Sequence, residues 1–143
     1  MRHFLTTEEE AEVVAAIRDF ELHSSVELRV CVSYRKPWKP EKLAWKVFEK
    51  LGMRATRDRN AVLICVLPKR RKFVVIGDTG VDEIVSAPFW NHVAAEMAAC
   101  FREEHPGAGI VRGIALLKER LSALWPASGD DVNELPNEIA QER

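Results

Sequence analysis

Two apolar runs separated by a short basic turn lie in the middle of the chain. Residues 60–67 and 72–76 are rich in Val, Leu and Ile, Pro68 to Arg71 lie between them, and Gly77 follows the second run. Runs of this length, bounded by turn residues, predict the two antiparallel strands of a hairpin. Neither run alternates apolar with polar residues, so both faces of each strand should be covered, usually by helices. The pattern therefore predicts two central strands of a sheet.

A third strand is predicted by strict alternation over residues 26–33. One face carries Val26, Leu28, Val30 and Val32, and the other carries Glu27, Arg29, Cys31 and Ser33. Alternation of this kind indicates a strand with one wetter face. We therefore expect this strand to lie nearer an edge of the sheet than the hairpin strands.

Four helices are predicted by apolar residues that recur at helical spacing. They cover residues 7–23, residues 40–51, about 87–104, and about 110–124. Residues with capping-box spacing stand at the start of the first helix, and Gly52 stands after the end of the second. A strand, a helix and a strand in this order form a right-handed crossover, so strands 26–33 and 60–67 should run parallel. The predicted fold class is α/β: an α/β/α sandwich with a mixed central sheet of about four strands and helices on both faces.

The length of 143 residues suits one domain. We expect residues 1–127 to form a single α/β domain. Residues 128–143 are acidic, with only Val132, Leu135 and Ile139 to bury. They predict an appended tail, which we expect to dock on the domain.

Composition limits the class of protein. Lys and Arg number 21 against 22 Asp and Glu, a formal net charge of −1, which argues against a general nucleic-acid binder. No segment has the length or apolar character of a membrane span or a signal peptide, so we expect a cytoplasmic protein.

The three cysteines lack the spacing of a zinc or redox pair and predict buried thiols. We expect a monomer or weak dimer whose protein partner, if any, is unknown.

The predicted strand pairing gathers three polar segments at one end of the sheet. Ser24-Ser25, Asp58 to Asn60 and Gly77 to Gly80 should meet there. Oxygen ligands on such loops suit a hard cation, so Ca²⁺ or Mg²⁺ is the candidate cofactor. The candidate ligands are Asp58, Asn60, Asp78, Asp82 and Glu83. The alternative is that these side chains bond loop amides or are solvated.

Two arginines beside the same loops predict a different ligand. Arg57 and Arg59 next to the Gly77–Gly80 segment suit an anion such as phosphate. A second basic cluster, Lys69 to Lys72, is interpreted as a solvated turn. The four tryptophans are assigned to core and inter-helix packing. No nucleophile and base can be paired from the sequence.

Several segments together resemble one family. They are Arg59 to Ile64, Lys72 to Glu83, Pro88 to Trp90 and Asp130 to Ile139. This combination resembles the TPM-domain family, specifically its short soluble bacterial members. The resemblance implies an α/β/α sandwich, and it implies divalent-cation binding, which is associated with some members. Relatives include a thylakoid-lumen protein described as an acid phosphatase and linked to photosystem II repair.

The positions that match the acidic loop of the family are Asn60, Asp78, Asp82 and Glu83. Two departures stand beside them: Val26 and Ala61 occupy positions that are usually glycine in the family. A side chain there would crowd any ligand that the family's backbone approaches.

Three hypotheses follow. The first is a cation-binding accessory or interaction module without turnover. The second is a metal-assisted phosphomonoester hydrolase, in which Asp78 and a neighbouring carboxylate hold the ion and Arg59 steadies the phosphate. The third is a structural partner protein that acts through its C-terminal tail.

Overall fold

The computed structural model describes residues 4–127 and 139–142. These residues fall into two compact units, each assembled from segments that are not continuous in sequence. Within the described ranges, one unit is formed by residues 4–26 with 86–127, and the other by residues 27–85 with 139–142. The expectation of a single domain over residues 1–127 stays a prediction.

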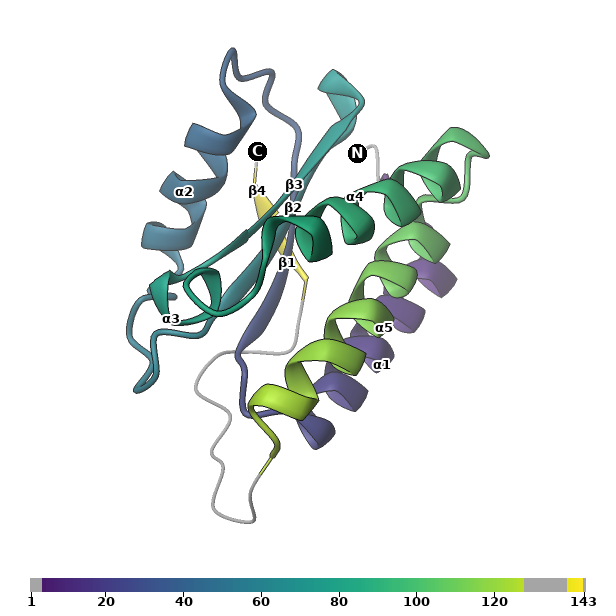
Figure 1. Cartoon of the computed structure of the whole chain (residues 1–143). Helices are drawn as coiled ribbons and strands as arrows, with labels where there is room; N and C mark the ends of the chain where they lie inside the picture. The colour runs from purple at the N-terminus through teal and green to yellow at the C-terminus, as the bar shows by residue number, and fades with distance from the viewer. Residues whose placement is uncertain (1–3, 128–138, 143) are drawn as a thin grey trace. The chain divides into compact units, whose positions relative to one another are not determined.

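The second unit contains a four-stranded mixed sheet with the order β3-β2-β1-β4 (Figure 1). Its strands are β1 (Leu28–Ser33), β2 (Val62–Leu67), β3 (Lys72–Gly77) and β4 (Ala140–Glu142). β1 runs parallel to both β2 and β4, whereas β2 and β3 are antiparallel. The predicted hairpin, crossover and mixed α/β sheet are thus confirmed.

Two predictions about the sheet edges are wrong. β1 is an interior strand, because Ala140–Glu142 pairs with it on the side away from β2. All six of its residues are buried, including Arg29 on the face that was expected to be wetter. β3, which was expected to be central, forms an edge, and its residues from Lys72 to Val75 are partly or fully exposed. The strand β4 was not predicted.

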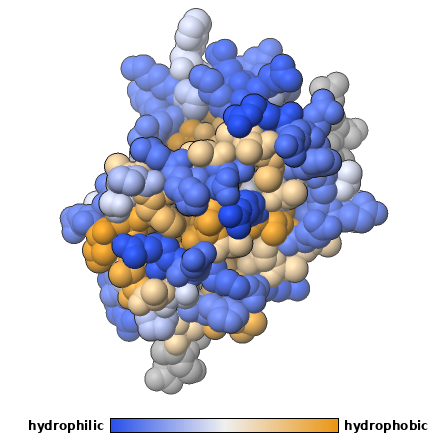
Figure 2. Space-filling view, turned by 45° about the vertical axis from the view of Figure 1, so that its right-hand side comes forward, coloured by the Kyte–Doolittle hydropathy of each residue, from blue (hydrophilic) through white to orange (hydrophobic). Residues whose placement is uncertain are grey.

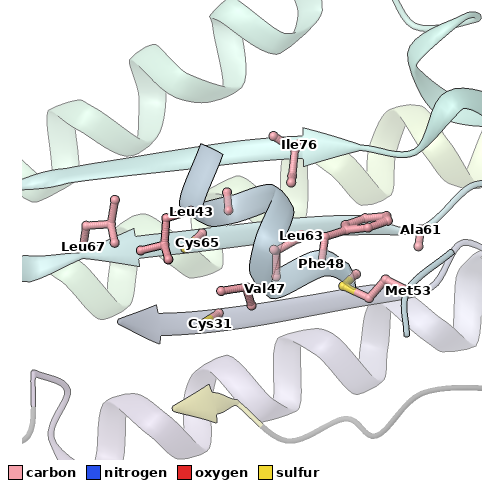
Figure 3. Close-up of a cluster of buried hydrophobic side chains, with 11 residues drawn as sticks. Cys31, Leu43, Val47, Phe48, Met53, Ala61, Leu63, Cys65, Leu67 and Ile76 are labelled. Carbon is pink, nitrogen blue, oxygen red and sulfur yellow. The ribbon is translucent and has the colours of Figure 1, made fainter. Parts of the chain in front are cut away.

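Helix α2 (Pro40–Lys50) packs against the sheet of its own unit (Figure 3). Pro40 occupies the first turn, as predicted, and Gly52 follows the helix with a φ of +68°, a conformation that favours glycine. The buried face of α2 contributes Leu43, Ala44, Val47 and Phe48 to one hydrophobic cluster. The sheet contributes Cys31, Leu63, Cys65, Leu67 and Ile76.

Two short helices were not predicted. The basic turn between β2 and β3 is a 3₁₀-helix, η1 (Pro68–Arg70). After β3, the chain forms one helical turn, α3 (Thr79–Asp82), with Asp78 as its N-cap. Asp is a preferred N-cap residue, so the Asp78-Thr79 pair carried a signal for this helix start.

The described part of the first unit contains three helices. They are α1 (Thr7–His23), α4 (Ala87–Arg102) and α5 (Pro106–Leu124). Their bounds agree with the predicted ranges within a few residues, and α5 begins at Pro106. Both α1 and α4 pack against α5 (Figure 1). Gly113 lets α5 approach α4 closely, because a Cβ there would lie 2.5 Å from the sulfur of Met97.

A capping box starts α1, and we expect its loss to be measurable. The Thr6 hydroxyl accepts a hydrogen bond from the Glu9 N–H at 3.1 Å, and the Glu9 carboxylate accepts one from the Thr6 N–H at 2.9 Å. Thr6→Ala should therefore lower the free energy of unfolding by about 1 kcal/mol. Urea denaturation followed by circular dichroism measures this loss. Glu12→Ala, an exposed substitution on the same helix, should change it little, and equal losses would contradict the assignment.

The tryptophans do not all pack as predicted. Trp45 packs edge-on against Phe48 with ring centroids 5.0 Å apart, but the side chain of Trp38 is 94% exposed. Within the described ranges, no helix combines the length and apolar character that crossing a bilayer requires.

Candidate functional site

A buried carboxylate, Asp78, lies where β3 meets α3. Its Oδ2 accepts a hydrogen bond from Arg59 Nε at 2.8 Å, and its Oδ1 accepts one from Arg59 Nη2 at 3.1 Å. Oδ1 also accepts hydrogen bonds from Arg54 Nη1 at 3.1 Å and from the Thr79 N–H at 2.7 Å. The side chain is fully buried. Asp78 is thus held by two guanidinium groups and by the helix start that it caps.

Arg54 reaches Asp78 from the loop that follows α2. Its guanidinium also pairs with Glu49, and its Cζ lies 5.3 Å from the Trp45 ring centroid and 5.4 Å from the Phe48 ring centroid. Cation–π contacts of this kind fix a guanidinium against an aromatic surface. The result is a continuous ion-pair network from Glu49 through Arg54 and Asp78 to Arg59, which we call the Asp78 network.

The Asp78 network sets the charge state of its central carboxylate. Burial by itself would raise the pKa of Asp78. The hydrogen bonds from Arg59 and Thr79, and the charges of Arg59 and Arg54, outweigh this effect and hold the pKa below its ordinary value. The same hydrogen bond to Asp78 raises the pKa of Arg59. Asp78 is therefore a carboxylate with compensated charge at any physiological pH.

Two of the three predicted loop segments meet at this junction. The Asp78 N–H donates to the Ala61 carbonyl at 2.9 Å, and the Gly80 N–H donates to the Arg59 carbonyl at 2.7 Å. Arg59 adopts the left-handed conformation, with a φ of +50°. Ser24 and Ser25, the third segment, belong to the helical unit.

The remaining candidate ligands take other positions. Asn60 is buried, and its N–H donates to the Thr56 hydroxyl at 3.3 Å. Asp58 is exposed and pairs with the exposed Arg57 at 3.5 Å. Asp82 and Glu83 are both exposed. The predicted ligands are thus near one another in sequence and topology, but each has a different environment.

This arrangement does not fit a divalent cation bound to Asp78. A hard cation takes six or more oxygen ligands, several of them anionic. In residues 4–127 and 139–142, no group of three or more His, Cys, Asp or Glu side chains is placed to hold a metal ion. Asp78 already accepts four hydrogen bonds, three of them from positively charged groups. Nor does Arg59 present an open anion site, because its anion is the carboxylate of Asp78.

Sequence reasoning missed Arg54 as a member of this network. Arg54 lies 24 positions before Asp78, and no local spacing rule links the two residues. The available signal was weaker: a third arginine shortly before Arg57 and Arg59 in a loop with few acidic residues.

Comparisons with known proteins agree with the fold. The family model of the TPM domain matches residues 1–120. The NMR structure of the BA42 protein from the psychrophilic bacterium Bizionia argentinensis is 35% identical, with a TM-score of 0.92, over 99% of this chain and 97% of that chain. No curated protein matches the sequence.

A more distant structure shares the fold alone. The solution NMR structure of the N-terminal domain of the cg2496 protein from Corynebacterium glutamicum has a TM-score of 0.65 at 13% identity. That match covers 88% of this chain and 78% of the other. The extent of the family match and the identity to BA42 lead to one conclusion: this chain belongs to the TPM-domain family.

Proposed function

We propose that this TPM domain is an accessory or interaction module without chemical turnover, in which the Asp78 network holds the loops in place. One observation carries the proposal: the buried carboxylate at the junction accepts hydrogen bonds from both Arg54 and Arg59 and from the Thr79 N–H. A carboxylate that is to bind a metal ion or move a proton needs an accessible oxygen and a pKa near the working pH. Asp78 has neither property, because it is buried and its pKa is lowered.

The hydrolase alternative requires Asp78 and Arg59 to bind external ligands, although in the structure they bind each other. In that mechanism Asp78 holds the ion and Arg59 binds the phosphate of the substrate. Here the two side chains bind each other, and a substrate would first have to separate them. Separating a buried carboxylate from its guanidinium partner leaves that charge uncompensated and costs several kcal/mol, about 3 to 5. The hydrolase is therefore the less favoured candidate.

Cation binding has a place in this proposal only outside the Asp78 network. Asp82 and Glu83 are exposed neighbours at the end of α3, so they are accessible to Ca²⁺ or Mg²⁺. Two exposed carboxylates provide fewer ligands than a dedicated site, so we expect weak binding, with a dissociation constant of about 1 mM. The tail hypothesis concerns residues 128–143. Ala140–Glu142 of this segment pairs with β1, whereas residues 128–138 lie outside the described residues. A partner role for the tail stays a prediction.

Two measurements on chelator-treated protein test the proposal. Calorimetric titration with CaCl₂ and MgCl₂ should give weak binding that Asp82→Asn/Glu83→Gln abolishes and that folded Asp78→Asn retains. An assay with p-nitrophenyl phosphate and added metal should show no hydrolysis above the buffer blank. Hydrolysis by the wild type that Asp78→Asn abolishes would instead establish the phosphatase. Equal hydrolysis by both would indicate a contaminating enzyme.

A further inference from the structure

An open pocket of about 480 Å³ lies at the opposite end of the sheet unit from Asp78. It is formed by the segment between β1 and α2 and by the first turns of α2. The lining side chains are Arg35, Lys36, Pro37, Trp38, Lys39, Lys42, Leu43 and Lys46. Five of them are basic and none is acidic. We call this site the Trp38 pocket.

The position of the Trp38 pocket follows from the strand directions. β2 ends at Leu67 and β3 begins at Lys72, so the η1 turn lies at the end of the hairpin away from Asp78. Strands of six residues separate the two ends by about 20 Å. The Trp38 pocket is therefore a separate site, and its ligand does not depend on the function proposed above.

Arg70 of η1 fixes one wall of the pocket. Its Nε donates to the Pro37 carbonyl at 3.1 Å, and its Nη2 donates to the Lys36 carbonyl at 3.2 Å. Its Cζ lies 5.7 Å from the ring centroid of Trp38. The β1–α2 segment is thus tied to the β2–β3 turn, as the two neighbouring tips in Figure 1 show. The pocket is held in place before any ligand binds, which lowers the entropic cost of binding.

Trp38 is exposed in a way that folding does not explain. Its side chain is 94% exposed, and its ring lies beside the guanidinium of Arg70. A large aromatic side chain normally stabilises a protein by being buried, and tryptophan is enriched at binding interfaces. With Arg70 near its ring, the indole still offers a broad apolar surface on which a planar group can stack.

The lysines at the start of α2 are placed against the preference of a helix N-terminus. Lys39 is the N-cap residue and makes no side-chain capping hydrogen bond, and Lys42 and Lys46 follow on the same side of the helix. A helix N-terminus carries partial positive charge, so cations there are unfavourable and anions are favourable. Glu41 is acidic but does not line the pocket. This arrangement lowers the stability of the isolated helix, and a bound anion would offset that loss.

The surrounding surface is strongly hydrophilic. Figure 2 shows one face of the molecule, on which hydrophilic residues predominate at the upper end. The β1–α2 segment and η1 form the same end of their own unit in Figure 1. Arg70, which contacts the segment that lines the pocket, belongs to a run of four basic residues, Lys69 to Lys72. The net charge of −1 for the whole chain therefore conceals a local concentration of positive charge.

We propose that the Trp38 pocket binds a nucleotide, with the base stacked on Trp38 and the phosphates beside Lys39, Lys42 and Lys46. The volume suits a ligand of this size, since small-molecule sites span about 300 to 1,000 Å³. A planar ring linked to phosphate matches an exposed indole beside a basic helix start better than a carboxylate peptide does, because the peptide leaves the indole unused. The nucleotide is either free in solution or one unit of a single strand.

Fluorescence anisotropy of the full-length protein tests this proposal, with a fluorescein-labelled short oligodeoxyadenylate as the probe. We expect binding that weakens with salt. Lys42→Ala/Lys46→Ala should weaken binding and reduce the slope of log affinity against log salt by about 1.4, because the probe is a single strand. Trp38→Ala should weaken binding about tenfold and leave that slope unchanged. ADP that displaces the probe identifies a free nucleotide as a sufficient ligand, and a bound probe that ADP does not displace identifies a single strand.

The control variant removes two positive charges from the helical unit, the same number that Lys42→Ala/Lys46→Ala removes from the sheet unit. Arg18→Ala/Arg120→Ala replaces two exposed arginines of α1 and α5 and should leave affinity and salt slope unchanged. All three variants alter exposed or partly exposed side chains, and thermal unfolding verifies that each folds. The proposal is overturned if the probe does not bind at low salt, or if Trp38→Ala binds as well as the wild type. It is also overturned if polyglutamate or phosphatidylserine vesicles displace the probe more effectively than nucleotides.

Discussion

Asp78→Ala should lower the free energy of unfolding by about 3 kcal/mol at neutral pH. The substitution removes the acceptor of four hydrogen bonds, leaves Arg54 and Arg59 without their shared partner, and removes the N-cap of α3. The two arginines are 39% and 43% exposed, so water can solvate them again, which places the loss at the lower end for a buried pair. Urea denaturation followed by circular dichroism measures the difference.

Asp78→Asn distinguishes the contribution of the negative charge of Asp78 from its contribution as the N-cap of α3. Asparagine still provides an oxygen that can accept from the Thr79 N–H, but it carries no charge for Arg54 and Arg59. We expect this variant to lose roughly half as much stability as Asp78→Ala, about 1.5 kcal/mol. If both variants unfold as the wild type does, the Asp78 network contributes nothing to the fold.

The pH dependence has a definite sign. The folded-state pKa of Asp78 lies below the ordinary value, which is about 3.9 in an unfolded chain. The contribution of ionised Asp78 to the free energy of unfolding is therefore fully present above its pKa in the unfolded chain. This contribution is lost as the pH falls through its pKa in the folded protein. The stability difference between wild type and Asp78→Asn should stay constant above about pH 5 and shrink below about pH 4. A difference that grows on acidification would contradict the assignment.

Gly80→Ala should lower the free energy of unfolding by about 3 kcal/mol. A Cβ at Gly80 would overlap the carbonyl oxygen of Asp58 and lie 2.6 Å from that of Arg59. Both neighbours are backbone atoms, which cannot turn aside as a flexible side chain can. The Gly80 N–H also donates to the Arg59 carbonyl at 2.7 Å, so moving the loop away breaks a hydrogen bond. Thermal and urea denaturation measure the loss.

Gly52→Ala is the matched control for Gly80→Ala. Gly52 has a φ of +68°, and no atom lies within 4 Å of the position that a Cβ would occupy there. Gly52→Ala should lower the free energy of unfolding by only about 1 kcal/mol, because alanine adopts this left-handed conformation less readily than glycine. A loss at Gly80 no larger than at Gly52 would mean that the close approach of the two loops has little importance.

The sequence predicted those parts of the fold that local pattern determines. The capping box at Thr6, Pro40 at a helix start and Gly52 after its end each act within a few residues, and the structure confirms them. The interior position of β1 could not be predicted in this way. It depends on Ala140–Glu142, three residues without a strand pattern, which pair through backbone groups that are common to all residues.

The candidate site was predicted in topology but not in chemistry. Antiparallel pairing of β2 and β3 places Asp58 to Asn60 beside Gly77 to Gly80, as expected. The hydrogen-bond partners within the site depend on the positions of side chains that are distant in sequence. Arg59 was expected to hold an external anion, and the anion beside it is Asp78 of the same chain. Arg54 joins from a third segment, which no spacing rule indicated.

The place of β4 in the sheet has a consequence for biosynthesis. β1 emerges early during translation, whereas Ala140–Glu142, its neighbour on one side, emerges more than 100 residues later, since β1 ends at Ser33. Until then, the backbone donors and acceptors on that side of Cys31 to Ser33 lack their final partners. A nascent chain therefore carries an open strand edge, the kind of surface that other chains can pair with, until this segment has been synthesised.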